Sequence, residues 1–158
     1  MLDEAATLNF GKRFAKAIQP NLTIFLYGDL GAGKTTLVRG LIQALGYEGK
    51  IKSPTYTIVE PYQLEYKVNS KLNLYHFDLY RFNDEEEWDS AGFREYFNTD
   101  SLCIIEWPEK AQNVLPPPDL NITFSIKNIG QCVGRTINIS AHSQLGQNCL
   151  HSISTGIR

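Results

Sequence analysis

Residues Gly28–Thr35, which read GDLGAGKT, match the pattern G-x-x-x-x-G-K-[ST] in full. A chance match in a chain of this length has odds of about half a percent. The glycines permit backbone angles closed to other residues and bring N–H groups close to phosphate oxygens. Lys34 is expected to bridge the β- and γ-phosphates, and the Thr35 hydroxyl to bind Mg²⁺. The sequence therefore predicts a site for a nucleoside triphosphate.

Such a site also needs an acid at the C-terminal end of a strand, and two candidates are present. Glu106 follows the continuous apolar run Leu102–Ile105, which is typical of a central parallel strand. Asp78 follows an alternating run. On that ground Glu106 is favoured for the metal shell, and Asp78 for organising the attacking water or a metal-bound water. A phosphate site accounts for both acids together, one in the metal shell and one at the water.

The segment Ser53–Tyr56 lies between the P-loop helix and the next predicted strand. In many P-loop proteins a hydroxyl residue in this connection responds to the γ-phosphate and the metal. An ordinary proline turn explains the segment equally well without a family resemblance. Arg81 is placed to reach a phosphate or to form a surface salt bridge, and Trp88 and Trp107 read as packing aromatics.

The elements that must position these residues follow from hydrophobic spacing. An amphipathic helix is predicted over residues 2–18, and the run after Gly33 predicts a second helix that ends at Gly46. The run Leu22–Tyr27 reads as a strand buried on both faces. Five further strands are predicted, over residues 55–60, 72–78, 101–105, 120–126 and 136–139. The first two form one antiparallel hairpin and the last two form another. A short helix is predicted with Asp84 as its cap.

Composition sets the class of molecule. The 158 residues suit one domain, and a net charge of −2 argues against autonomous, charge-driven binding of nucleic acid. No apolar stretch is long enough to span a bilayer, and no secretory signal is visible, so a cytoplasmic protein is expected. Cys103, Cys132 and Cys149 lack metal-site spacing and read as reduced thiols. We expect residues 1–140 to form the catalytic domain and 141–158 a loosely structured tail of open role.

Missing motifs narrow the functional class. The chain has no Asn-Lys-x-Asp guanine-specificity sequence, no Leu-Ser-Gly-Gly-Gln transporter signature and no evident arginine-rich lid of a nucleotide kinase. A minimal ATPase without an obvious phosphoryl acceptor remains. Two alternatives stay open at this point, namely a nucleotide-gated binding module and a small-molecule P-loop kinase.

Four motifs in order and spacing resemble the TsaE (YjeE) family, over about residues 3–140. They are GDLGAGKTT at 28–36, SPTY at 53–56, HFDLYR at 76–81 and IEWPE at 105–109. An early Thr7-x-x-x-Gly11 element is similar to the N-terminal pattern of that family. Only the first of these motifs is generic.

The resemblance implies an α/β P-loop NTPase-like sandwich with a mixed, mainly parallel central sheet and antiparallel hairpins. It implies an ATPase, weak alone, that uses ATP/ADP and Mg²⁺ and is required for threonylcarbamoylation of adenosine 37 in tRNAs reading ANN codons. The partner would be a TsaD–TsaB complex, with tRNA reached through that complex and no membrane involved.

The resemblance also assigns residue roles. Lys34, Asp78 and Glu106 would be catalytic, with Asp78 and Glu106 as the two acids of the family, and Trp107 would lie near the site. Thr35 would hold the metal together with Glu106, the acid favoured above, although the resemblance leaves open which acid holds the metal and which the water. Residues Thr7 and Gly11 would lie near the nucleoside, and Thr55 would belong to the switch-like loop. The full set of expected cofactor-binding residues is Thr7, Gly11, Asp29, Gly31, Ala32, Gly33, Lys34, Thr35, Thr36 and Thr55.

Overall fold

The computed structural model describes residues 3–67 and 69–155, and within these ranges it leaves the side chains of Ile129, Cys132 and Thr155 undescribed. Leu2, Val68 and residues 156–158, which fall in the predicted first helix, a hairpin loop and the tail, lie outside the described residues. The elements in chain order are α1 Glu4–Ala15, β1 Thr23–Tyr27, α2 Lys34–Ala44, β2 Val59–Glu65, β3 Lys71–Asp78, α3 Glu86–Ser90, η1 Phe93–Tyr96, β4 Ser101–Glu106, η2 Pro108–Ala111, β5 Leu120–Ile129, β6 Cys132–Ala141 and α4 Gln144–Thr155.

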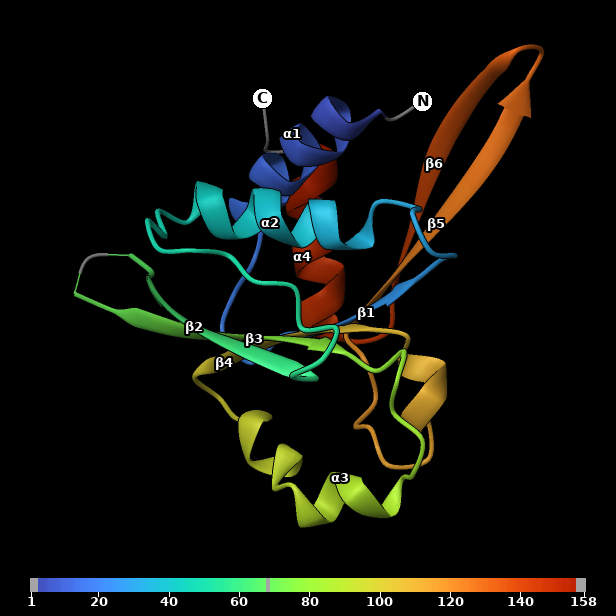
Figure 1. Cartoon of the computed structure of the whole chain (residues 1–158). Helices are drawn as coiled ribbons and strands as arrows, with labels where there is room; N and C mark the ends of the chain where they lie inside the picture. The colour runs from blue at the N-terminus through green and yellow to red at the C-terminus, as the bar shows by residue number, and fades with distance from the viewer. Residues whose placement is uncertain (1–2, 68, 156–158) are drawn as a thin grey trace.

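A six-stranded sheet with the order β2-β3-β4-β1-β5-β6 forms the middle layer. Strands β3, β4, β1 and β5 run parallel, while β2–β3 and β5–β6 are antiparallel hairpins at the two edges. The predicted mixed, mainly parallel sheet with antiparallel hairpins is therefore confirmed. Helices α1, α2 and α4 cover one face and α3 covers the other, while the β5–β6 hairpin extends beyond the sheet (Figure 1).

Each face of the sheet carries its own apolar core. One core packs α1, α2 and α4 against the sheet, and it includes the fully buried Leu41 and Cys149. The other gathers aromatic side chains around Phe77 and Trp88. Trp88 has no exposed surface, which confirms its predicted packing role. These two cores fix the ends of the parallel strands, where the predicted acids lie.

Three local predictions need correction. Helix α1 ends at Ala15 rather than near residue 18, although Ala17 and Ile18 are still buried. Strand β2 begins at Val59, because residues 55–57 form a turn and Ile58 adopts a left-handed φ of 70°. Helix α3 begins at Glu86, although the Asp84 carboxylate still accepts a hydrogen bond of 2.9 Å from the Glu86 amide.

The expectation of a loosely structured C-terminal tail is wrong for its described part. Residues Gln144–Thr155 form helix α4, and Cys149 and Ile153 on it are buried in the core. Asp119, just before β5, anchors the start of this helix, since one carboxylate oxygen accepts from the Ser143 hydroxyl at 2.6 Å and the other from the Thr23 amide at 2.7 Å. Burial raises the pKa of the Cys149 thiol to about 12, so this cysteine stays a thiol at neutral pH.

Candidate functional site

A cleft of about 470 Å³ opens above the C-terminal ends of β1, β3 and β4. In open α/β sheets this edge is where ligands bind. The cleft brings together nine of the residues predicted from sequence: Gly31, Ala32, Gly33, Lys34, Thr35, Thr36, Thr55, Asp78 and Glu106. These residues come from the P-loop and three later segments of the chain, so the fold assembles them as the motifs require.

The loop between β1 and α2 has the backbone that its glycines allow. Gly28 adopts a φ of 146°, and a Cβ there would lie 3.0 Å from atoms of Phe124. Gly33 caps α2 with a φ of 109° and without a side-chain hydrogen bond to the first turn. No acidic side chain lies in that first turn. The amides and the positive end of the helix dipole are thus available to an anion.

Lys34 is buried at the base of the cleft with only 4% of its surface exposed. Its ammonium donates to the carbonyl of Gly28 and lies 3.6 Å from the centroid of the Trp107 ring. Burial lowers the pKa of Lys34, and the neighbouring carboxylates, Glu106 first among them, partly oppose this effect. Trp107, expected to pack and to lie near the site, therefore contacts the lysine directly.

The Thr35 hydroxyl lies 3.0 Å from Oε2 and 3.1 Å from Oε1 of Glu106. Within the described ranges, no three His, Cys, Asp or Glu side chains form a closed metal cage. Mg²⁺ at phosphate sites is held instead by one or two protein oxygens, together with phosphate oxygens and water. A hydroxyl and a carboxylate converging at the cleft supply this kind of donor set, so the residues fit the ion.

Asp78 ends β3 in direct register with Glu106 at the end of β4. Because the two strands are parallel and adjacent, both acids emerge at the same edge of the sheet. Oδ1 of Asp78 accepts a hydrogen bond of 3.0 Å from the Tyr80 amide. Burial raises the pKa of Asp78, and the nearby Glu106 carboxylate adds to this rise. Glu106 lies on the more central strand, as its apolar run predicts.

The segment 53–56 approaches the cleft through Thr55. Its hydroxyl is 2.7 Å from that of Ser53, and the Tyr56 side chain is 82% exposed. The Arg81 guanidinium lies 4.8 Å from the centroid of the Tyr56 ring. The salt bridge expected for Arg81 is not seen among the described residues, because its guanidinium stacks on the Tyr56 ring instead. A phosphate contact by Arg81 stays a prediction.

Three residues expected to bind the nucleotide do not line the cleft. Asp29 is exposed at the loop, where its carbonyl accepts from the Ala32 amide. Thr7 is buried, and its methyl group lies 3.5 Å from the position a Cβ would take on Gly33. Gly11 lies where α1 crosses α2. Nucleotide contacts by these three residues stay predictions.

Other residues of the cleft were not among the predicted site residues. They are Asp3 and Glu4 at the start of α1, Leu30 in the P-loop, and Val133 and Arg135 on β6. Only the folding of the β5–β6 hairpin brings Arg135 to the P-loop, so local spacing held no signal for it. His76 was also missed, although it precedes Asp78 by two residues and thus shares a face of β3. Its imidazole contacts Glu106 at 2.5 Å.

Comparison with known proteins supports the resemblance seen in the motifs. The model of a family described as "Threonylcarbamoyl adenosine biosynthesis protein TsaE" matches residues 1–137. A TsaE protein of Haemophilus influenzae is 45% identical over 157 residues, covering 96% of this chain and 94% of the relative. A TsaE protein of Bacillus subtilis is 38% identical over 118 residues, covering 75% and 70% of the two chains.

The fold also has a counterpart among solved structures. The crystal structure of Bacillus subtilis YdiB superposes with a TM-score of 0.71 at 28% identity, and it covers 99% of this chain and 92% of that one. Among the described residues, no helix is both long and apolar enough to cross a bilayer.

Proposed function

This chain belongs to the TsaE family of threonylcarbamoyl adenosine biosynthesis proteins, and from this premise we propose that it binds ATP with Mg²⁺ and hydrolyses it to drive that biosynthesis. The observation that carries the proposal is the convergence of Lys34, Thr35 and Glu106 in one cleft at the start of α2. A flexible glycine turn of purely structural function has no use for a buried lysine and a buried glutamate at its base.

The P-loop and Lys34 are proposed to bind the triphosphate. Backbone amides at Gly31–Thr35 and the start of α2 bind the phosphate oxygens. The Lys34 ammonium leaves the Trp107 ring and the Gly28 carbonyl and contacts the phosphate instead. Burial of Lys34 strengthens this exchange, because a desolvated ammonium gains more from an anion than a solvated one does.

Thr35 and Glu106 are the residues proposed to hold the metal. When bound, Mg²⁺ supplies neutralisation of the charge that develops on the phosphate oxygens. Glu106 is anchored for this role by β4, which lies between two parallel neighbours at the centre of the sheet.

Asp78 is proposed to orient the attacking water and accept its proton. Its raised pKa supports this assignment, because a base transfers protons most effectively when its pKa approaches the working pH. The register with Glu106, the acid proposed for the metal, supports this assignment, because it brings both carboxylates to the same edge of the sheet.

We further propose that turnover is slow in the isolated protein and rises with a TsaD–TsaB complex in the cytoplasm. An arginine finger is worth about 10³–10⁵ in rate. Arg135 lines the cleft, but it comes from the edge strand β6, on the opposite side of β1 from both acids. A group supplied by a partner would complete the site, with tRNA reached through the partner complex.

The test measures release of inorganic phosphate from ATP with and without TsaD–TsaB, together with threonylcarbamoyladenosine in bulk tRNA from depleted cells. Loss of the modified nucleoside on depletion and a rise in rate with the partners support the proposal. Equal rates with and without partners would count against partner activation. Transfer of γ-phosphate to a metabolite would instead indicate a kinase.

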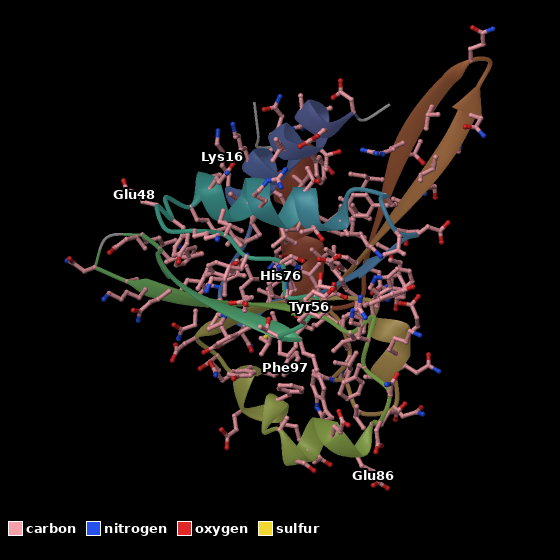
Figure 2. The ribbon with its side chains drawn as sticks, in the orientation of Figure 1. Lys16, Glu48, Tyr56, His76, Glu86 and Phe97 are labelled. Carbon is pink, nitrogen blue, oxygen red and sulfur yellow. The ribbon has the colours of Figure 1, made fainter. Side chains whose placement is uncertain are left out.

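Substitution of the acids separates an ATPase from a nucleotide-gated binding module. Glu106→Gln and Asp78→Asn should retain ATP binding but lose hydrolysis and the modification. Glu86→Gln is the matched control, because Glu86 is exposed on α3 and points away from the cleft (Figure 2). A hydrolysis-deficient variant that still supports repeated cycles of modification would favour the module.

A further inference from the structure

A buried histidine contacts the candidate metal-binding carboxylate from outside the cleft. His76 on β3 is 1% exposed and Glu106 on β4 is 3% exposed, and Nε2 of the histidine lies 2.5 Å from Oε2 of the glutamate. His76 lies in the interior between α2 and the sheet (Figure 2). It is not among the residues that line the nucleotide cleft, so it does not touch the substrate itself.

The strands dictate this contact. His76 is in register with Ile104, and Asp78 with Glu106, so β3 places histidine and aspartate on one face, one strand away from the glutamate. With Glu106 ionised, the carboxylate is an acceptor only, and Nε2 must carry the proton. The imidazole therefore donates to Glu106.

Glu106 receives hydrogen bonds from two side chains among the described residues. Thr35 donates through a single hydroxyl shared between both carboxylate oxygens, and His76 donates to Oε2. A shared hydroxyl fixes the plane of a carboxylate poorly. The Thr35 hydroxyl is also a group that the proposed function assigns to the metal. When this hydroxyl binds the metal, His76 remains as a hydrogen-bond partner of the Glu106 carboxylate.

The surroundings of His76 argue against a purely structural histidine. A histidine kept for packing normally uses both ring nitrogens, since a buried polar atom without a partner costs about 1–3 kcal/mol. Nδ1 of His76 is buried and has no hydrogen-bond partner among the described residues. The residue borders a cavity of about 190 Å³, shared with Thr35 and with Ile51–Ser53. Among the described residues, Glu106 is thus the hydrogen-bond partner that the fold provides for this buried imidazole.

We propose that His76 is a positioning residue that holds the Glu106 carboxylate in the orientation needed to bind Mg²⁺ with the nucleotide. The inference rests on the proposed function, because it assigns Glu106 to the metal shell. Hydrogen-bond partners behind a metal-binding group typically contribute about 10–100-fold in metal affinity or activity.

The test compares His76→Gln, His76→Asn and His76→Leu. The glutamine amide nitrogen reaches about as far from the backbone as Nε2, whereas the asparagine amide reaches only as far as Nδ1. The readout is ATP affinity by calorimetry at zero and at saturating Mg²⁺, so that the metal-dependent gain in affinity is measured without turnover. Thermal unfolding of each variant shows whether it is folded.

We expect the gain produced by Mg²⁺ to fall about tenfold in His76→Asn and His76→Leu, and to be largely restored in His76→Gln. Metal-free ATP affinity should stay unchanged in all three. A gain equal to wild type in a folded His76→Asn would overturn the inference, as would a parallel loss of metal-free affinity, which indicates a structural role. If His76→Leu does not fold, the Gln–Asn pair decides.

The two proposals fail in different ways. Wild-type protein that binds no ATP at any Mg²⁺ concentration would overturn the proposed function and this inference with it. If Mg²⁺ increases the ATP affinity of the wild type, Glu106→Gln removes this increase and His76→Asn leaves it intact, only the role of His76 would be overturned.

Discussion

The hydroxyl of Thr35 and the carboxylate of Glu106 lie 3.0–3.1 Å apart, although 71 positions separate them in the chain. Thr35 belongs to the first turn of α2, and Glu106 is the last residue of β4, the parallel neighbour of β1. The P-loop joins β1 to α2, so the pairing of β1 with β4 is what brings hydroxyl and carboxylate together. This contact defines the base of the cleft.

Removing the Thr35 hydroxyl should weaken the response to Mg²⁺. Thr35→Val keeps the shape of the side chain but supplies no oxygen, and we expect a loss of about 10–100-fold in metal-dependent ATP affinity or turnover. Thr35→Ser retains the hydroxyl and is the matched control. A Mg²⁺ titration of ATP binding measures both variants. Identical titrations for Val and Ser would show that this hydroxyl does not serve the metal.

Nucleotide binding should change the fluorescence of Trp107. The Lys34 ammonium lies 3.6 Å from the centroid of its ring, and the proposed function moves that charge to the phosphates. The chain has two tryptophans, so a Trp88→Phe background isolates the signal. ATP should then shift the emission, and adding Lys34→Met should abolish the shift. An ATP-dependent shift of equal size in the Met variant would contradict the movement of the lysine.

Asp78→Asn should stabilise the protein at neutral pH while reducing hydrolysis about 10²–10⁴-fold. Burial raises the folded pKa of Asp78 above its unfolded value, so the unfolded chain loses the proton first as pH rises. The free energy of unfolding of the wild type therefore falls as the pH rises from the unfolded to the folded pKa of Asp78, and it stays lower above the folded pKa. Asparagine has no proton to lose, and its carbonyl can still accept from the Tyr80 amide.

Thermal unfolding over a pH series measures this effect. The melting temperature of Asp78→Asn should exceed that of wild type at pH 7, and the difference should shrink as the pH falls below about 4, the usual pKa of an unfolded aspartate. A variant that is less stable than wild type at pH 7 would contradict the burial of this charge.

Gly11→Ala should destabilise the fold through the contact of α1 with α2. A Cβ there would lie 2.5 Å from the Leu37 carbonyl oxygen and 2.9 Å from the Leu41 amide, both in the backbone of α2. Overpacking of this kind costs about 1–3 kcal/mol, and about 2–4 °C of melting temperature per kcal/mol is typical for 150–250 residues.

Lys12→Ala, on the exposed face of the same helix, is the control for Gly11→Ala. ATP affinity measured well below the melting temperature separates packing from the predicted nucleotide contact of Gly11. Unchanged affinity in a destabilised variant indicates packing. Unchanged stability would contradict the close approach of the two helices.

The sequence predicted most of the residues that meet in the cleft, because they lie in local motifs. A glycine-rich loop between an apolar strand and an amphipathic helix specifies a phosphate site, and acids after buried strands meet at one edge of a parallel sheet. Asp78 and Glu106 therefore appeared as a pair before their register was known. The central position of β4 was likewise indicated by the unbroken apolar run before Glu106.

What the sequence did not reveal depends on contacts between distant segments. Helix α4 was missed although Leu145, Cys149, Leu150 and Ile153 lie at helical spacing in an otherwise polar segment, and this face packs against the core beside the anchoring Asp119. Arg135 reaches the cleft only because the β5–β6 hairpin folds beside the P-loop. The strand over 55–60 was placed too early because Ile58, a β-branched residue that favours strands, adopts a left-handed turn conformation.

Calorimetric titration of the whole chain with ATP and Mg²⁺ tests the central claim most directly, with Lys34→Met as the paired variant. One nucleotide should bind per chain in wild type, and the variant should lose about 10–100-fold in affinity, as expected for hydrogen bonds to a charged group worth about 1.5–3 kcal/mol. No heat of binding to folded wild type, or equal affinity in Lys34→Met, would contradict a triphosphate site at this loop.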